Sequence, residues 1–173
     1  MAEREIEVLI TTEKINKRLS ELASQIEADF LDDDMVVVGV LKGSFVFMAD
    51  LVRRIKRPLS CDFVRVSSYH DDKSTGIIRM EFDMTQPVEE KNVLLVEDIV
   101  DTGKTLRHLL KHMQTKKPRS LRVAALLYKD MGTGVRDLVD YVGFEVPKKF
   151  VIGYGLDSNG LYRSLPYVGA FKE

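Results

Sequence analysis

The sequence has little cysteine and no marked excess of charge of either sign. Cys61 is the only cysteine among 173 residues, which excludes an intrachain disulfide and a metal site built from several cysteines. Lys and Arg number 26 against 27 Asp and Glu, so the net charge is −1. A general nucleic-acid binder is expected to be basic, so any recognition of phosphate by this chain must be local.

Long apolar runs are also missing. Met1 to Glu7 is charged and lacks the apolar core of a secretory signal. No apolar run approaches the roughly 20 residues that span a bilayer. A single cysteine fits a reducing compartment, so we expect a cytoplasmic protein. The balance of 45% hydrophobic and 31% charged residues is that of a globular protein, and the length suits one domain over residues 1–173.

Short β-branched runs alternate with segments of helical spacing. We expect helices around 15–26, 45–55 and 106–113, with Thr12 as a cap of the first. We expect strands at 36–41, 63–67, 77–82, 93–96, 123–127, 141–144 and 150–154. This alternation indicates an α/β fold with a mostly parallel sheet.

Several segments show weaker signals. Residues 68–76 are polar and are expected to form a loop, and 68–90 is a candidate mobile segment. His108 and His112 are expected on a solvated helix face, because no glutamate follows His108 as a zinc-protease pattern would require. Cys61 is expected to be a small apolar filler.

Two carboxylates, Glu97 and Asp98, follow directly after the apolar strand at 93–96. Burial without partners would be costly for them. The carboxyl edge of a parallel sheet is where ligands bind in open α/β folds. There the pair could accept hydrogen bonds from hydroxyl groups or approach a metal.

A glycine-containing loop, Asp101 to Thr105, follows the acidic pair and opens a helix. Gly103 allows a tight turn, and the free amides at a helix start favour an anion such as phosphate. In the alternative reading, Asp101 or Thr102 is only a helix cap. A Walker A loop is excluded, because Asp98 stands where its first glycine is required.

Five segments together resemble one family. Residues 93–105 (VLLVEDIVDTGKT) resemble the phosphoribosyl-pyrophosphate signature of type I phosphoribosyltransferases. Residues 41–44 (LKGS), 67–69 (SSY), 148–157 (KKFVIGYGLD) and 162–166 (YRSLP) resemble the 6-oxopurine branch, the hypoxanthine-guanine phosphoribosyltransferases, in the same order. The resemblance implies a twisted, mostly parallel sheet flanked by helices, with a small hood built from the chain termini.

The resemblance also implies a purine-salvage reaction. Such enzymes transfer 5-phosphoribose from phosphoribosyl pyrophosphate to N9 of hypoxanthine or guanine, giving IMP or GMP and pyrophosphate, with Mg²⁺ as cofactor. Bond breaking at the anomeric carbon gives it oxocarbenium character. The site must therefore hold two anionic ends and neutralise the departing pyrophosphate.

By resemblance, Asp101 is the acid/base that faces N7 of the purine. Glu97 and Asp98 hold the ribose hydroxyls and could also lie near a metal through water. The residues implied to cradle the 5′-phosphate are Thr102, Gly103, Lys104 and Thr105. Those implied to bind pyrophosphate are Lys42, Gly43 and Arg163, with a cis peptide common between positions 41 and 42. Asp157 would bind Mg²⁺.

By resemblance, a separate group of residues would bind the purine. Lys129 would donate to O6 and so select 6-oxopurines over adenine. Phe150 would stack on the base, and Val151 would present its main-chain carbonyl to the base edge. Ser68 and Tyr69 would begin a flexible loop that closes over the site.

Two other functions remain open from the residues alone. A regulator could keep this fold to sense a nucleotide, although the catalytic set looks complete. An adenine or pyrimidine phosphoribosyltransferase would share the central motif but would not explain Lys129 and Phe150. Preference among hypoxanthine, guanine and xanthine is open, and a homodimer or homotetramer is expected only by analogy.

Overall fold

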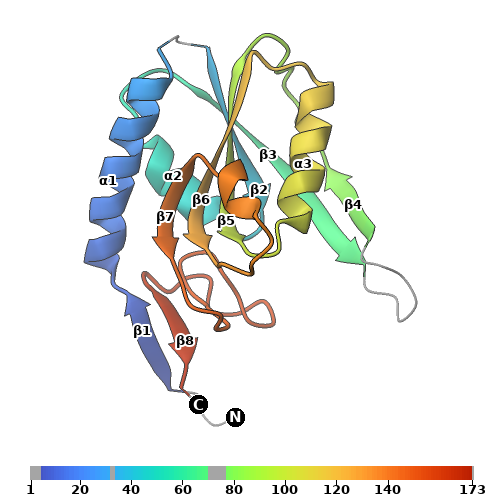
Figure 1. The fold of residues 1–173 in the computed structure, drawn as a ribbon. Helices are drawn as coiled ribbons and strands as arrows, with labels where there is room; N and C mark the ends of the chain where they lie inside the picture. Colours follow the sequence, from blue (N-terminus) through green and yellow to red (C-terminus); the bar gives the residue numbers. More distant parts are fainter. Residues whose placement is uncertain (1–4, 32–33, 70–76, 173) are drawn as a thin grey trace.

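The computed structural model describes residues 5–31, 34–69 and 77–172 (Figure 1). Its centre is a six-stranded sheet in the order β4-β3-β2-β5-β6-β7. The strands are β2 (Met35–Leu41), β3 (Ser60–Tyr69), β4 (Ile77–Phe82), β5 (Asn92–Val100), β6 (Ser120–Tyr128) and β7 (Tyr141–Glu145). Every pairing is parallel except that of β3 with β4. The predicted α/β fold with a mostly parallel sheet is therefore confirmed.

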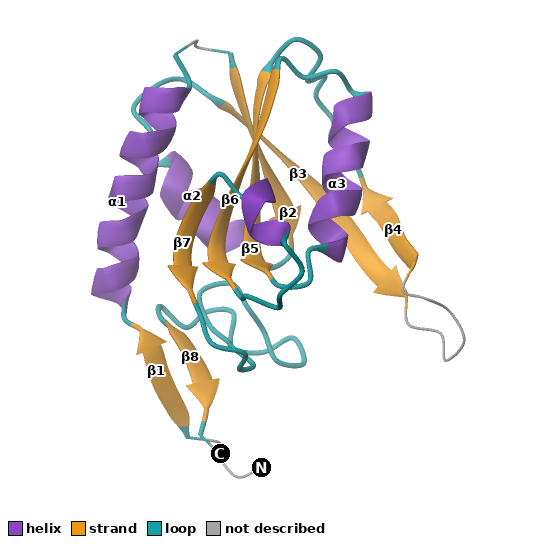
Figure 2. Cartoon of the chain, viewed as in Figure 1, coloured by secondary structure: helices purple, strands orange, loops and turns teal. Residues whose placement is uncertain are grey.

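Helices cover both faces of the sheet (Figure 2). α1 (Thr12–Asp29) and α2 (Phe45–Val52) share one core with Leu94 and Val96 of β5. α3 (Lys104–Thr115) and the short 3-10 helix η1 (Val135–Leu138) share the other core with Val93 and Leu95. Because successive strand residues point to opposite faces, a strand covered on both sides is apolar throughout.

The start of α1 differs from the prediction by one residue. Thr11 is the cap, and its hydroxyl accepts from the amide of Lys14 at 3.4 Å. The hydroxyl of Thr12 instead donates to the main-chain oxygen of Pro166 at 2.9 Å. Thr12 therefore ties the first helix to a segment near the other end of the chain.

The hood expected from the termini is present as a separate two-stranded sheet. β1 (Ile6–Ile10) pairs antiparallel with β8 (Val168–Phe171), below the carboxyl ends of the main sheet in Figure 1. The strand predicted at 150–154 is wrong. Gly153, Tyr154 and Gly155 have φ values of 92°, 50° and 103°, which a strand does not allow, and only isolated bridges form there.

The described parts of the segment 68–90 are strand residues and packed loop, and the mobility of the segment remains a prediction. Ser68 and Tyr69 belong to β3, so the loop predicted at 68–76 begins too early, and residues 70–76 lie outside the described residues. β4 forms as predicted, and Val88 is 2% exposed in the core. Residues 77–90 are therefore part of the packed domain.

Two predictions about single side chains are also wrong. Cys61 is exposed and does not fill the core. His112 is half-buried, and its Nε2 lies 3.0 Å from a carboxylate oxygen of Asp83, which also pairs with Lys116 at 2.7 Å. His108 is exposed, as predicted. The cluster of Asp83, His112 and Lys116 joins the segment after β4 to α3.

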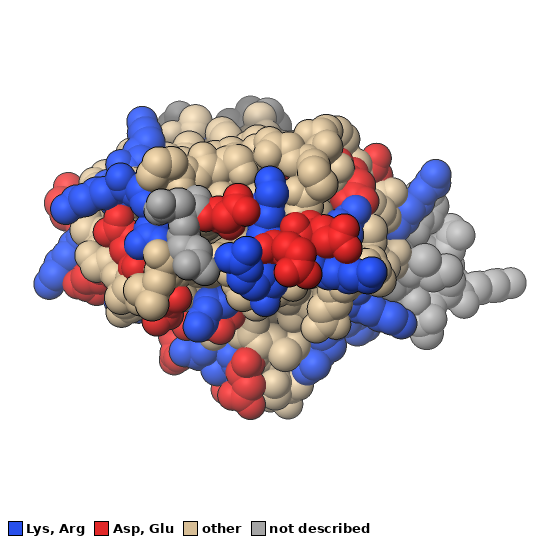
Figure 3. Space-filling model, turned by 90° about the horizontal axis from the view of Figure 1, so that it is seen from above, with Lys and Arg blue, Asp and Glu red and all other residues tan. Residues whose placement is uncertain are grey.

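Among the described residues, charges of both signs are mixed on the face seen from above, where the parallel strands begin. Lys and Arg are interspersed there with Asp and Glu (Figure 3). In the part of the chain that the structure describes, no helix is long and apolar enough to cross a membrane.

Candidate active site

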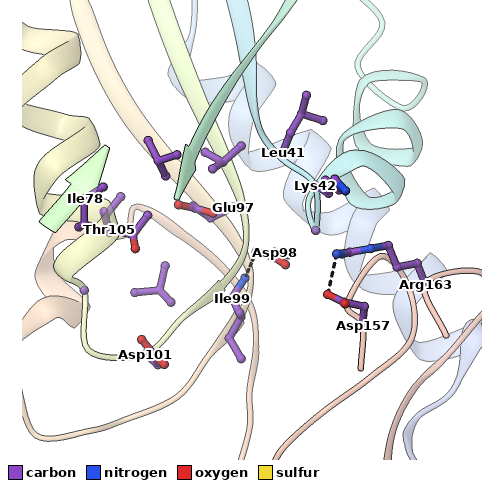
Figure 4. A pocket seen from close by; sticks show the side chains of 16 residues that line it. Leu41, Lys42, Ile78, Glu97, Asp98, Ile99, Asp101, Thr105, Asp157 and Arg163 are labelled. Carbon is purple, nitrogen blue, oxygen red and sulfur yellow. Dashed lines mark hydrogen bonds and ion pairs between the residues drawn. The ribbon is translucent and has the colours of Figure 1, made fainter. Parts of the chain in front are cut away.

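One pocket lies at the carboxyl ends of the parallel strands (Figure 4). It lies where the loops after β2 and β5 meet the segment between β7 and β8. Nine of the predicted site residues line it: Lys42, Gly43, Glu97, Asp98, Asp101, Gly103, Thr105, Asp157 and Arg163. Residues far apart in the sequence are thus brought to one edge of the sheet, where open α/β folds bind ligands.

The acidic pair lies on β5 itself, which runs on to Val100 and not only to Val96. Glu97 is 5% exposed, and its burial, together with the neighbouring Asp98, raises the pKa of its carboxyl well above the usual range. Burial likewise raises the pKa of Asp98 to about 6, opposed by the amide of Ile99 that donates at 2.9 Å. The pocket floor therefore favours protonated carboxyls or bound hydroxyls and cations.

The loop after β2 presses directly against Asp98. A Cβ added to Gly43 would lie 1.5 Å from Asp98 Oδ2, so any side chain at this position would force the carboxylate of Asp98 to move. The peptide bond between Leu41 and Lys42 is cis. The loop proposed for pyrophosphate is therefore in direct contact with Asp98, one of the two carboxylates proposed for ribose.

The loop after β5 ends in a left-handed glycine. Gly103 has φ +74° and is the N-cap of α3, with no side-chain cap bond. A Cβ there would lie 2.1 Å from Val135, so neither its backbone conformation nor the space admits another residue. The reading of Asp101 or Thr102 as the helix cap is therefore wrong. The amides of the first turn of α3 lack partners within the helix and are available to an anion.

Asp101 itself is exposed at the pocket mouth. Its Oδ1 accepts a hydrogen bond from the amide of Thr102. Thr105 is half-buried and faces the pocket, whereas Thr102 and Lys104 are exposed and do not line it. Of the predicted phosphate loop, Gly103 and Thr105 therefore line the pocket. Thr102 and Lys104 are left to contribute through their main-chain amides.

Arg163 and Asp157 form an ion pair across the pocket wall. Nη2 of Arg163 lies 2.6 Å from Oδ1 of Asp157, and Nη1 donates to the main-chain oxygen of Gly155 at 2.6 Å. The second carboxylate oxygen of Asp157 accepts from the amide of Gly160 at 2.7 Å. Neither residue is a freely solvated surface charge.

The predicted purine residues lie together beside the main pocket, at the hood. Lys129 Nζ donates to the main-chain oxygen of Lys149 at 2.8 Å, next to Phe150. Phe150 is 62% exposed, so it is not a core residue, while Val151 is buried. Ala170 and Phe171 of β8 line the same depression as Phe150. The sequence gives no local signal for them, because their partner strand lies at the other end of the chain.

Val66 and Ile78 also line the main pocket and were not predicted. They come from β3 and β4, whose hairpin lies at one edge of the sheet (Figure 1). The predicted return strand was the one signal that could have found Ile78. The side chains of Ser68 and Tyr69 lie outside the described residues, so their predicted loop role remains a prediction.

The donor atoms of the pocket fit one kind of metal binding. Among residues 5–31, 34–69 and 77–172, no group of three or more His, Cys, Asp or Glu is arranged to hold a metal ion. Mg²⁺ commonly binds through one or two carboxylates together with substrate phosphates and waters. Asp98 and Asp157 supply such oxygens, so the site fits a Mg²⁺ that is held largely by its phosphate ligand.

Known proteins are similar to this chain in sequence and fold. A family described as phosphoribosyl transferase domain matches residues 8–159. The chain is 48% identical over 172 residues to hypoxanthine-guanine phosphoribosyltransferase of Dictyostelium discoideum, with 96% of each chain covered. It is 44% identical over 167 residues to the protein of that name from Staphylococcus aureus, covering 96% of this chain and 93% of the other.

A solved structure agrees over its whole length. The crystal structure of a hypoxanthine-guanine phosphoribosyltransferase from Bacillus anthracis is 41% identical and superimposes with a TM-score of 0.91, covering 98% of this chain and 100% of that one. Family match, identity and fold all point the same way: the chain belongs to the phosphoribosyltransferase family.

Proposed function

We propose that the chain is a Mg²⁺-dependent hypoxanthine-guanine phosphoribosyltransferase, acting in purine salvage. One observation carries the proposal: a single pocket joins an acidic pair, a helix start open to an anion and an arginine, with an exposed aromatic ring beside it. These are the groups that phosphoribosyl pyrophosphate and a purine require. By analogy with its relatives, the protein forms a homodimer or homotetramer.

Glu97 and Asp98 bind the ribose hydroxyls at the pocket floor. Burial raises the pKa of both carboxyls, because it removes the water that stabilises their charged form. Hydrogen bonds from the ribose hydroxyls replace that water. The 5′-phosphate binds at the start of α3, where Gly103 brings the main chain close and Thr105 adds a hydroxyl. The ribose is thereby fixed at both ends.

Pyrophosphate leaves on the side of Lys42, Gly43 and Arg163. The guanidinium of Arg163 has a geometry that suits phosphate oxygens, and Lys42 adds a second positive charge. Asp157 would hold Mg²⁺ on this side together with the pyrophosphate, and the bound ion would supply positive charge to the leaving group. These groups offset the charge that develops as the anomeric bond breaks.

The purine binds against Phe150, with Lys129 at its O6. The hydrogen bond from Lys129 to Lys149 holds the ammonium next to the stacking ring. Adenine carries an amino group at position 6, which leaves this ammonium without an acceptor and disfavours adenine strongly. Asp101, exposed at the pocket mouth, faces N7 of the purine and accepts the proton that the base loses there.

The test is a direct assay of nucleotide formation. The protein is mixed with Mg²⁺, phosphoribosyl pyrophosphate and one of hypoxanthine, guanine, xanthine or adenine, and the nucleotide is measured by absorbance or chromatography. We expect IMP or GMP and no AMP. Absence of turnover with every 6-oxopurine would overturn the proposal, and AMP formation would reassign the base.

A further inference from the structure

Two loops touch on the pyrophosphate side of the pocket. A Cβ added to Gly155 would lie 2.1 Å from the main-chain oxygen of Gly43, so the two main chains are in contact. Arg163 donates to the oxygen of Gly155 and pairs with Asp157. The placement of Asp157 and Arg163 relative to Gly43 therefore depends on how residues 153–157 are held.

Tyr154 anchors residues 153–157 on the side that does not line the main pocket. It has φ +50° between two glycines that are also left-handed, a conformation that needs support from its surroundings. Tyr154 is 5% exposed, and its hydroxyl donates to Oδ2 of Asp50 at 2.6 Å. Its amide donates to the oxygen of Leu165 at 2.9 Å.

Asp50 lies on α2, the helix that follows the Gly43 loop directly. Its other carboxylate oxygen is paired with Arg53, and its main-chain oxygen accepts from Arg54 at 2.7 Å. One short helix thus carries the Gly43 loop at its start and the acceptor for Tyr154 further along. Neither Asp50 nor Tyr154 lines the main pocket; both line a separate depression that shares only Arg163 with it.

We infer that Asp50 and Tyr154 are positioning residues for pyrophosphate: their hydrogen bond fixes the spacing between the Gly43 loop and the pair of Asp157 and Arg163. This inference rests on the proposed function for the roles of those residues. The purine side is held independently, because the main chain of Ile152 exchanges two hydrogen bonds of 2.9 Å with Gly169 of β8. Loss of the bond should therefore weaken the pyrophosphate end and spare the nucleotide end.

The experiment compares two ligands by calorimetry on the full chain: pyrophosphate with saturating Mg²⁺, and GMP. Tyr154→Phe removes one oxygen, and Asp50→Ala removes the acceptor. We expect each to weaken Mg²⁺-pyrophosphate binding about tenfold, the loss typical of one hydrogen bond to a charged group, with GMP binding unchanged. Asp50→Asn keeps an oxygen acceptor and should restore most of the affinity.

Tyr141→Phe is the matched control. The hydroxyl of Tyr141 donates to Asp29 at 2.7 Å, and Tyr141 is also buried, but it lies on the edge strand β7 and does not line the main pocket or the depression beside Arg163. It should lower the melting temperature without changing either affinity. If Tyr154→Phe leaves Mg²⁺-pyrophosphate affinity unchanged, or weakens both ligands equally, the inference is wrong. If the unaltered protein binds neither ligand, the proposed function falls as well.

Discussion

The guanidinium of Arg163 lies 2.6 Å from the carboxylate of Asp157, so the residue proposed for pyrophosphate is paired with the residue proposed for Mg²⁺. A cation that arrives at Oδ1 of Asp157 competes with this ion pair. A phosphate that arrives at Arg163 competes for the same guanidinium. Binding of the cation should therefore free Arg163 for phosphate, and binding of phosphate should free Asp157 for the cation. The two ligands should then bind better together than separately.

The first prediction concerns Asp157→Asn. The amide cannot attract a cation as a carboxylate does, so the Mg²⁺ concentration for half-maximal turnover should rise about tenfold, by loss of one charged ligand. Initial rates against Mg²⁺ concentration measure it. Asp137→Asn, an exposed acid on η1, is the control. An equal rise in both variants would mean that general surface charge, and not coordination, is responsible.

The second prediction concerns Asp101→Asn. The amide cannot take a proton, so kcat should fall by about 10²- to 10⁴-fold, the usual contribution of a general acid or base. The carboxylate is exposed and contacts only the amide of Thr102 among the hydrogen bonds that the structure describes, so folding should be unaffected. Calorimetry should find phosphoribosyl pyrophosphate binding intact. A parallel loss of binding and turnover would assign Asp101 to binding.

The third prediction concerns Gly43→Ala. The new methyl group would collide with Oδ2 of Asp98, and overpacking of this kind costs about 1–3 kcal/mol of stability. Denaturant unfolding measures the loss. In the double variant Gly43→Ala with Asp98→Ala the colliding carboxylate is gone, so stability should recover while activity stays low. A double variant no more stable than Gly43→Ala alone would show that the contact is not the cause.

The fourth prediction concerns pH and the cluster of Asp83, His112 and Lys116. Burial raises the pKa of Asp83, but hydrogen bonds from Lys116, Met84 and His112 outweigh it and lower the pKa overall. A lowered pKa in the folded state gives stability that is present above the unfolded-state pKa and is lost as pH falls through the folded-state pKa.

Asp83→Asn should therefore destabilise the protein at neutral pH, by less than about 1 kcal/mol because the group is partly exposed. The difference from the unaltered protein should vanish in acid, below the ordinary carboxyl range. Thermal melts from pH 3 to pH 8 measure it. A difference that stays constant across this range would rule out the charge on Asp83 as its source.

Local patterns predicted much of the sheet and the position of the acidic pair. β2, β5 and β6 are buried on both faces and so read as continuous apolar runs. The extent of β5 was underestimated, because its pairing with β6 continues through Ile99 and Val100, beyond the apolar stretch. Strand length there is set by the neighbouring strand, which a local pattern does not contain.

The parts that were not predicted depend on distant contacts. The apolar residues at 150–154 suggested a strand, yet left-handed backbone at Gly153 and Gly155 makes this segment a tight loop. β1 is short, and its register with β8 has no local signature. The Asp157–Arg163 pair and the Asp50–Tyr154 bond likewise join elements whose proximity only the fold creates.

The pairing of β1 with β8 sets an order of assembly during translation. Among the described strands, β1 leaves the ribosome before the others, and β8, with which it pairs, leaves after every strand of the main sheet. The six-stranded sheet, with the start of α3 that we propose for the 5′-phosphate, can therefore form while β1 is still unpaired. The wall beside Phe150, which includes Ala170 and Phe171, is completed last. On the nascent chain, the 5′-phosphate site proposed at the start of α3 should therefore form before the wall proposed for the base is complete.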